Sequence, residues 1–357
     1  MNIYVKAYLD KNLGDDLMLI QLIRNTHIKD KLFVHCEAGN LEFYQKLLTE
    51  YPQVTLVDCP LRKIPQKYGT KFFSWILQIG GSVLMGNSYK GCWYRTLNYF
   101  LIRRLQNAGA KYGIIGCNVG PYKNSITRFF VKLEISSTNF MTVRDQFSFN
   151  FIKRENSSKK QVYIFPDILV EAADDFQVEH INDKRKKCLG VSVHGPSSQI
   201  LNQRLSQICS DYIRCTDGNI LLLCFHAGKQ DDEKAAYMVY SKIPIELRQN
   251  VEIIRHSTDY LNLLKKIGYC TEILAIRFHA AILAISQNIP FMAVAYNCKM
   301  SNYLNDIGVK GLGLEEFTSI DSKELVYKLL NDPIIPDDQW KLNSNQHFEI
   351  LRRELDG

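Results

Sequence analysis

The sequence predicts an α/β fold with two Rossmann-like, doubly wound domains that face a cleft. Short apolar runs alternate along the chain with amphipathic segments, a rhythm typical of parallel strands covered by helices. At 357 residues the chain is long for a single hydrophobic core. A polar and charged stretch at residues 171–187 divides the alternation into two series and is the best candidate linker.

The elements expected in each series follow from these runs. The first series contains seven candidate strands: Asn2 to Leu9, Leu32 to Cys36, Val54 to Val57, Leu77 to Gly80, Tyr112 to Cys117, Met141 to Val143 and Val162 to Phe165. The second contains five: Leu189 to Val193, Ile220 to Phe225, Val251 to Ile254, Cys270 to Ile276 and Phe291 to Ala295. The clearest helix, Asp15 to Arg24, carries acidic residues in its first turn, where they complement the helix dipole.

From this order we expect an N-terminal domain at residues 1–175 and a C-terminal domain at residues 188–335. The tail at residues 336–357 is expected to be helical and can pack back onto the first domain.

Composition indicates an ordinary globular, cytoplasmic protein. The chain is 46% hydrophobic and 23% charged. Its N-terminus lacks the basic and apolar regions of a signal peptide, and no apolar run is long enough to span a membrane. Ten cysteines without a CxxC pair indicate reduced thiols and neither a disulfide framework nor a zinc site. The net charge of +7 comes with no nucleic-acid reading motif, so no nucleic-acid partner is expected.

The most informative segment places three cationic or titratable side chains after two strands. Arg277 and His279 follow one apolar run, and Lys299 follows the next, three residues after Tyr296. Open α/β sheets bind ligands beyond the carboxyl ends of their strands, and helix N-termini there attract anions. Arg, imidazole and ammonium groups together suit a phosphate or a carboxylate. Each alone has a structural explanation, but all three at strand ends favour a site.

Two segments of the first series end strands in the same way. In the block 12–16, Gly14 is expected to allow a tight turn, and Asn12 and Asp15 to point into the cleft. Asp15 could serve as a general base or hydrogen-bond acceptor, or could cap the helix, and the local sequence favours neither. Gly80 and Gly81 would let a ligand approach the backbone, although such pairs mostly form turns.

Arg144 follows another short strand and would present its guanidinium at the same edge. The structural alternative is an ion pair between Arg144 and Asp145. A structural role is expected for Asp167, and Asp231 and Asp232 are expected mainly to complement a helix dipole.

Taken together, these blocks resemble the polysaccharide pyruvyl transferase family. The motifs are NLGDD at 12–16, GGS at 80–82, GCNVGP at 116–121, VRD at 143–145, FPD at 165–167, GVSVHG at 190–195, CFHAGKQDD at 224–232 and RFHAAILAISQNIPFMAVAYNCK at 277–299. The last block is the most specific. Ser82 and Phe278 depart from the family pattern, which has Gly and Leu there, without changing an ionisable group.

The resemblance implies a fold similar to GT-B glycosyltransferases and transfer of pyruvate from phosphoenolpyruvate onto a sugar. The product would be a cyclic ketal, commonly a galactose-type 4,6-ketal, of a capsular or exopolysaccharide precursor. The family's donor-binding Arg, His and Lys map onto Arg144, His279 and Lys299, with Arg277 as a further donor ligand. His279 is assigned to the donor phosphate or to general acid catalysis, and Asp15 is the candidate base. No metal or cofactor is expected.

Because the donor residues come from both halves, the acceptor is expected to lie against the first half, near Asn12, Gly14, Asp15, Gly80 and Gly81. That acceptor could be lipid-linked at the inner face of the membrane, because the segment Lys90 to Arg104 is basic and aromatic. For that segment we prefer a core helix whose arginines reach solvent. The alternative functions are a GT-B glycosyltransferase with a nucleotide-sugar donor and a non-catalytic module, which the complete Arg144, His279 and Lys299 set disfavours.

Overall fold

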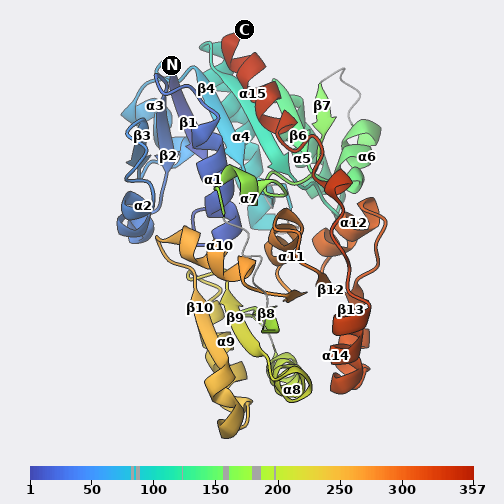
Figure 1. Cartoon of the computed structure of the whole chain (residues 1–357). Helices are drawn as coiled ribbons and strands as arrows, with labels where there is room; N and C mark the ends of the chain where they lie inside the picture. Colours follow the sequence, from blue (N-terminus) through green and yellow to red (C-terminus); the bar gives the residue numbers. More distant parts are fainter. Residues whose placement is uncertain (82–83, 86–88, 123, 156–160, 179–185, 197) are drawn as a thin grey trace. The chain divides into compact units, whose positions relative to one another are not determined.

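The computed structural model of the protein describes residues 1–357 except 82–83, 86–88, 123, 156–160, 179–185 and 197 (Figure 1). The chain divides into two compact units. Unit 1 comprises Met1–Leu9, Asp15–Ile168 and Asn343–Gly357, and unit 2 comprises Asp10–Gly14 and Leu169–Leu342. Each unit is built around its own parallel β-sheet.

Unit 1 contains a seven-stranded sheet with the order β3-β2-β1-β4-β5-β6-β7. Its strands are β1 (Asn2–Lys6), β2 (Lys31–His35), β3 (Val54–Val57), β4 (Trp75–Ile79), β5 (Lys111–Cys117), β6 (Phe140–Val143) and β7 (Val162–Ile164). Its helices are α1 (Leu13–Arg24), whose first two residues group with unit 2, α2 (Leu41–Leu47), α3 (Ile64–Lys67), α4 (Tyr89–Asn107), α5 (Ser125–Ser136), α6 (Gln146–Glu155) and α15 (Gln346–Asp356). The strand order reverses between β1 and β4, which makes the sheet doubly wound.

Unit 2 contains a six-stranded sheet with the order β10-β9-β8-β11-β12-β13. Its strands are β8 (Cys188–Ser192), β9 (Asn219–Cys224), β10 (Val251–Arg255), β11 (Glu272–Ala275), β12 (Phe291–Ala295) and β13 (Leu312–Gly313). Its helices are α7 (Ala172–Asp175), α8 (Gln199–Thr216), α9 (Asp232–Lys242), α10 (Tyr260–Gly268), α11 (Phe278–Ser286), α12 (Cys298–Asp306), α13 (Leu314–Ser319) and α14 (Ser322–Asn331). The order reverses between β8 and β11.

Burial explains why continuous apolar runs became strands. Every residue of β4 and β8 is buried, as expected for central parallel strands covered on both faces. The predicted strands Val54–Val57 and Phe291–Ala295 coincide with β3 and β12. Of the predicted strand from Cys270 to Ile276, only the four residues of β11 form a strand. Cys270 and Ile276 are buried, which extends the apolar pattern, but they lie outside the strand. β13 was not expected, since two residues are too short to show a pattern.

The segments flanking unit 2 also take defined structure. α7 lies within the expected linker, and the Ala173 N–H donates to Ser286 Oγ of α11 at 2.7 Å. In unit 1, the tail helix α15 is held by the buried His347, which bonds Thr142 of β6 and the carbonyl oxygen of Pro166. In the described part of the chain, no helix is both long and apolar enough to cross a membrane.

Candidate active site

At the carboxyl edge of the unit 2 sheet, Arg277 is held by two acceptors. Its Nε lies 3.1 Å from Asp232 Oδ2, Nη2 pairs with Asp232 Oδ1, and Nη1 lies 2.7 Å from Gln230 Oε1. Arg277 also occupies the N-cap position of α11, although its side chain makes no capping bond. The guanidinium therefore supports the edge of the sheet. That Arg277 also contacts a donor stays a prediction.

Asp232 does more than complement the dipole of α9. Its Oδ2 accepts the backbone N–H groups of Phe225 and His226 at 3.0 and 2.9 Å, and its Oδ1 accepts that of Gly195 at 2.7 Å. These residues follow β9 and β8, whereas Arg277 follows β11. One buried carboxylate thus ties three neighbouring strand ends together.

His194 and Tyr296 lie at the same edge, and His194 is the second residue after β8, at the switch point of the sheet. The His194 Nε2 and Tyr296 Oη atoms are 3.5 Å apart, and the ring centroids are 5.1 Å apart. Burial, reinforced by the positive charge of Arg277, lowers the pKa of His194 to about 4. A neutral imidazole beside a phenol offers hydrogen-bonding groups without charge. The sequence analysis missed His194, although its place after a strand at a switch point is a usable signal.

The segment of residues 10–14, called loop 10–14 because it runs from the loop after β1 into the first two residues of α1, is fixed to the end of β9 within unit 2. Asn12 forms an antiparallel bridge with His226, and the Gly228 N–H donates to His226 Nδ1 at 3.1 Å. His226 Nε2 lies 3.4 Å from Asp10 Oδ2. Burial lowers the pKa of His226 to about 4, so its ring is neutral near pH 7. The loop is therefore a defined part of the site.

The imidazole of His279 lies against the backbone of this loop at Gly14. A Cβ atom added to Gly14 would overlap the Nδ1 and Cγ atoms of His279. Gly14 lies in the first turn of α1 and does not have a positive φ, so the expectation that it serves a tight turn is wrong. The structure requires glycine here because the ring occupies the space that a side chain would fill.

In unit 1, Arg144 is buried between two acceptors at the carboxyl edge. Its Nη1 pairs with Asp167, and its Nε lies 2.8 Å from Asn118 Oδ1. The alternative of an Arg144–Asp145 pair is wrong: Asp145 instead accepts from Ser148 N, Ser148 Oγ and Asn118 Nδ2. The structural role expected of Asp167 is confirmed, since its buried carboxylate holds the guanidinium.

The glycine pair 80–81 lies beside this arginine. A Cβ atom added to Gly81 would overlap the guanidinium of Arg144. Gly80 has a φ of 131°, a conformation that other residues rarely adopt. The group that approaches the backbone at Gly81 is therefore a side chain of the protein itself. Ser82, the third residue of the block, lies outside the described residues.

The remaining predicted residues occupy helix starts. Asp15 lies in the first turn of α1 and is not its N-cap, because the helix begins at Leu13, so the capping alternative is wrong. Asn12 Oδ1 accepts the Gly14 N–H at 3.2 Å. Lys299 is half-buried in the first turn of α12. The structure thus brings Asn12, Gly14 and His279 together in unit 2.

A second cationic group lies at the switch point of the unit 1 sheet. Lys6 is the last residue of β1, and burial lowers the pKa of its ammonium while the nearby Glu134 opposes that shift. Glu134 is itself buried and paired with Arg95 Nη1 at 2.8 Å. The sequence analysis did not single out Lys6, because the first strand was expected to continue to Leu9, whereas β1 ends at Lys6.

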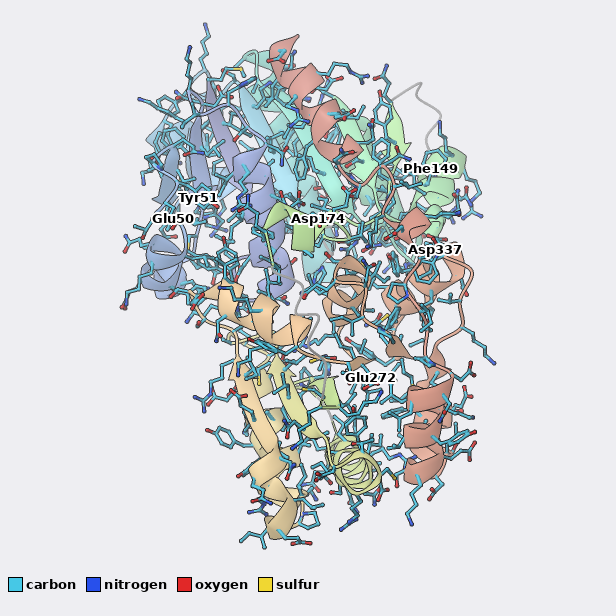
Figure 2. All side chains as sticks on the ribbon, in the orientation of Figure 1. Glu50, Tyr51, Phe149, Asp174, Glu272 and Asp337 are labelled. Atoms are coloured by element: carbon cyan, nitrogen blue, oxygen red, sulfur yellow. The ribbon has the colours of Figure 1, made fainter. Side chains whose placement is uncertain are left out.

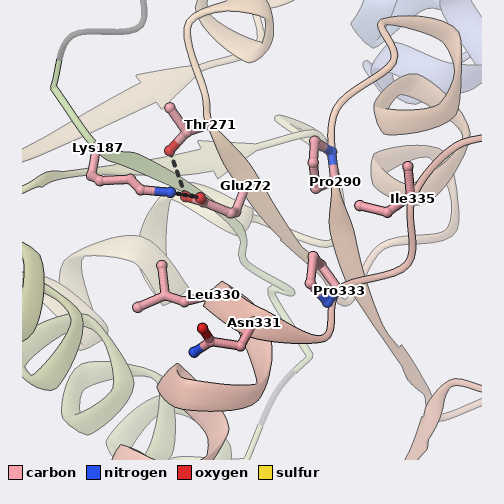
Figure 3. Close-up of a pocket in the computed structure, with 8 residues that line it drawn as sticks. All are labelled: Lys187, Thr271, Glu272, Pro290, Leu330, Asn331, Pro333 and Ile335. Atoms are coloured by element: carbon pink, nitrogen blue, oxygen red, sulfur yellow. Dashed lines mark hydrogen bonds and ion pairs between the residues drawn. The ribbon is translucent and has the colours of Figure 1, made fainter.

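A pocket of about 550 Å³ lies at the opposite, amino edge of the unit 2 sheet (Figure 3). Glu272, which begins β11 (Figure 2), bonds Lys187 Nζ at 2.5 Å, Tyr212 Oη at 2.8 Å and Thr271 Oγ1. Because this carboxylate is fully engaged and the other lining groups are mostly apolar, the pocket offers no set of groups for catalysis.

Comparisons with known proteins identify the family and the fold of the chain. A family model for polysaccharide pyruvyl transferase matches residues 12–297. No curated protein matches the chain.

Solved structures resemble the whole chain at low identity. UDP-GlcNAc 2-epimerase from Methanocaldococcus jannaschii is 12% identical, covers 100% of this chain and 99% of its own, and gives a TM-score of 0.62. Anabaena Alr3699/HepE in complex with UDP is 12% identical, with 99% of each chain covered and a TM-score of 0.58. Acinetobacter baumannii MurG is 11% identical, covers 97% of this chain and 94% of its own, and gives a TM-score of 0.50. The predicted fold class, two doubly wound domains of the GT-B type, is confirmed.

Proposed function

This chain belongs to the polysaccharide pyruvyl transferase family, and we propose that it transfers pyruvate from phosphoenolpyruvate onto a sugar. The acceptor is a capsular or exopolysaccharide precursor, with a galactose-type 4,6-ketal as the product. The observation that carries the proposal is the family match over residues 12–297, which includes Arg144 and His279, with Lys299 two residues beyond it.

The donor side of the proposal uses cationic groups. Phosphoenolpyruvate carries a phosphate and a carboxylate, and Arg144 and Lys299 are proposed to hold these anionic groups. His279, half-buried beside Gly14, binds the phosphate or protonates the donor. Arg277 keeps this edge ordered through Asp232 and is proposed to add to the positive potential there. The chemistry uses neither a metal nor a cofactor.

The reaction proceeds in two additions at one carbon. One sugar hydroxyl adds to the central carbon of the enol while a proton converts the methylene group to methyl. Phosphate then leaves, and the second hydroxyl attacks the same carbon to close the ketal ring. The two hydroxyl protons balance the proton delivered to carbon and the one taken by phosphate. Asp15 is proposed to accept a hydroxyl proton as general base.

The acceptor is proposed to bind near Asn12, Gly14, Asp15, Gly80 and Gly81. A lipid-linked sugar at the cytoplasmic face of the membrane is the proposed form of this acceptor. Two hydroxyls of one sugar must reach the same carbon, so the residues around them have to be fixed in place. The bonds that hold loop 10–14 to the end of β9 support such order.

Phosphate release from phosphoenolpyruvate, measured with and without sugar acceptors, tests the proposal. His279→Ala should abolish turnover, and Arg144→Ala and Lys299→Ala should each raise the KM for phosphoenolpyruvate. Arg144→Lys should not restore activity, because an ammonium lacks the bidentate fork that Asp167 and Asn118 position. Near wild-type kinetics for all three alanine variants would show that this site does not transfer pyruvate.

The same assay decides between donors. A GT-B glycosyltransferase would release a nucleoside diphosphate from a nucleotide sugar and would leave phosphoenolpyruvate untouched. A GT-B glycosyltransferase would share this fold, so the released product has to distinguish glycosyl transfer from pyruvyl transfer. Sugar-dependent nucleoside diphosphate release without phosphoenolpyruvate consumption would replace the proposal.

Asp15→Asn tests the proposed base. The amide cannot take a proton, so turnover should fall by about 10²–10⁴-fold while donor binding remains. Because Asp15 lies inside the first turn of α1, helix formation should be little affected. Wild-type turnover at saturating donor and sugar would remove Asp15 from the mechanism.

A further inference from the structure

Helix α4 of unit 1 exposes large aromatic side chains. Trp93 and Phe100 are each 65% exposed and Tyr94 is 55% exposed, so the expectation of a core helix is wrong for this side of α4. Trp93, Leu97, Phe100 and Arg104 are spaced by four, three and four residues, which places them on one helix face. That face is apolar along most of its length and ends in a guanidinium.

The neighbouring helix α5 extends the apolar surface. Ile126 and Phe129, three residues apart on one face of α5, are 50% and 55% exposed. The two helices are linked by the Arg95–Glu134 ion pair and by Gln106 Nε2, which donates to the Ser137 carbonyl oxygen at 2.7 Å. The described part of unit 1 thus carries a group of exposed apolar side chains on two adjoining helices, here called the α4–α5 face.

The charge of this region has one sign. No Asp or Glu occurs between Asp58 and Glu134, whereas twelve Lys and Arg do. Glu134 is buried and paired with Arg95, so it does not offset the exposed charge. The whole chain contains 44 basic and 37 acidic residues, so the chain outside this stretch has more acidic than basic residues. The positive charge of the protein is therefore concentrated in the stretch that contains the α4–α5 face.

We propose that the α4–α5 face docks on an anionic lipid bilayer. Exposed apolar groups of this size need a partner, and Trp and Tyr favour the membrane–water interface. Exposed Arg103 and Arg104 on the same helix would meet anionic head groups, while Leu97 and Ile126 reach the acyl boundary. Charge complementarity and apolar burial thus select the same partner.

The position of the face gives the docking a use. α4 and α5 follow β4 and β5, so their first turns lie toward the carboxyl edge of the unit 1 sheet, where Gly81 and Arg144 lie. Docking there would hold this edge near head groups of a lipid-linked acceptor. Membrane binding itself is independent of the proposed reaction and can be measured without any substrate.

Co-sedimentation of the full chain with vesicles tests the docking. Vesicles of phosphatidylcholine with about 30% phosphatidylglycerol should bind the protein at low salt, and pure phosphatidylcholine should bind it weakly. Binding should decrease between 0.1 and 1 M salt, as the screening length falls from about 10 to about 3 Å. Absence of binding to anionic vesicles at low salt would overturn the proposal.

Matched variants locate the contact. Arg103→Glu with Arg104→Glu, and separately Trp93→Ser with Phe100→Ser, should each reduce vesicle affinity by about tenfold or more. Control pairs with the same change of charge, or with the same loss of exposed large side chains, lie at exposed positions of unit 2: Lys310→Glu with Lys323→Glu, and Ile200→Ser with Tyr327→Ser. Equal losses in test and control pairs would overturn the assignment, as would tight oligonucleotide binding with the same dependence on Arg103 and Arg104.

The fluorescence of Trp93 also reports how deeply this side chain inserts into the bilayer. Of the other two tryptophans, Trp75 is buried and Trp340 is half-buried in unit 2, so brominated lipids should quench mainly Trp93. The quenching should largely disappear in Trp93→Phe, which keeps an aromatic ring. Quenching that persists in Trp93→Phe would show that another surface inserts. Phosphate release with a soluble sugar acceptor should be unchanged in the α4–α5 variants, so failure of docking and failure of pyruvyl transfer give different results.

Discussion

Two glycines define the places of two predicted donor-binding side chains. Gly14 leaves room for the imidazole of His279 in unit 2, and Gly81 leaves room for the guanidinium of Arg144 in unit 1. Neither glycine has a positive φ, so the backbone does not require them. Each glycine therefore matters for the position of the neighbouring side chain. Adding one methyl group at either glycine should disturb the site more than it lowers the stability of the fold.

Gly14→Ala should remove most activity while leaving the protein folded. The added methyl overlaps His279, whereas alanine within a helix otherwise costs nothing and usually stabilises it. Kinetics of phosphate release together with thermal unfolding provide the measurement. Gly313→Ala is the control in the same unit, because its Cβ would meet nothing within 4 Å. Unchanged kinetics in Gly14→Ala would show that the ring position does not matter.

Gly81→Ala should weaken donor binding more than it lowers the maximal rate. The methyl displaces the Arg144 guanidinium from the place set by Asp167 and Asn118, so the KM for phosphoenolpyruvate should rise about tenfold or more. Gly39→Ala serves as the control in unit 1, since that position opens onto free space. A normal KM in the Gly81 variant would contradict this role of Arg144.

At the scale of elements, the carboxyl edge of the unit 2 sheet depends on one carboxylate. Asp232 accepts backbone N–H groups that follow β8 and β9 and pairs with Arg277 after β11. Loops at this edge carry His194 and His226, so their order depends on Asp232. A residue expected to complement a helix dipole turns out to organise the edge.

Asp232→Asn should destabilise the protein by about 3 kcal/mol. The amide leaves the buried guanidinium of Arg277 without its counter-charge, and breaking one side of a buried pair is costly. Asp231→Asn is a close control, because Asp231 only caps α9 through Lys234 N, and Asn caps equally well. Chemical denaturation measures both, and equal stabilities would refute the organising role.

At the level of the whole protein, the half-buried His194 and the buried His226 and His347 make stability depend on pH. Burial lowers the pKa values of His194, His226 and His347 to about 4, below the usual 6.5. Between these values the unfolded chain binds more protons than the folded one, so stability is complete above about pH 6.5 and falls as pH drops toward 4. For the fully buried His347 the loss amounts to about 3 kcal/mol at most.

Thermal unfolding from pH 4 to 8 checks this expectation, and the melting temperature should fall steadily below about pH 6.5. His347→Gln removes one titrating group while keeping a side chain that can bond Thr142 or the Pro166 carbonyl oxygen. This variant should be less stable at pH 7 but less sensitive to acid. A wild-type melting temperature independent of pH between 6.5 and 4.5 would contradict the assignment of neutral rings.

Much of the fold followed from local pattern. Continuous apolar runs such as those of β4 and β12 indicate strands buried on both faces, and their alternation with helices gives parallel, doubly wound sheets. Boundaries shifted where apolar residues are buried beyond a strand, as at Cys270 and Ile276. Sequence periodicity indicates mainly which residues are buried, whereas the ends of a strand are set by hydrogen bonding.

Local sequence was enough to predict the class of fold, the family, and the positions of His279, Lys299 and Arg144 after strands, because these depend on composition and on residues near one another in the chain. The pairing of Arg144 with Asp167, the pairing of Arg277 with Asp232, and the contact of His279 with Gly14 became visible in the folded chain alone. The tertiary structure also showed that the aromatic side chains of α4 face outward, since an apolar helical stripe has the same pattern whether a core or a membrane covers it. Such pairings join residues distant in sequence, and strand order and packing fix them.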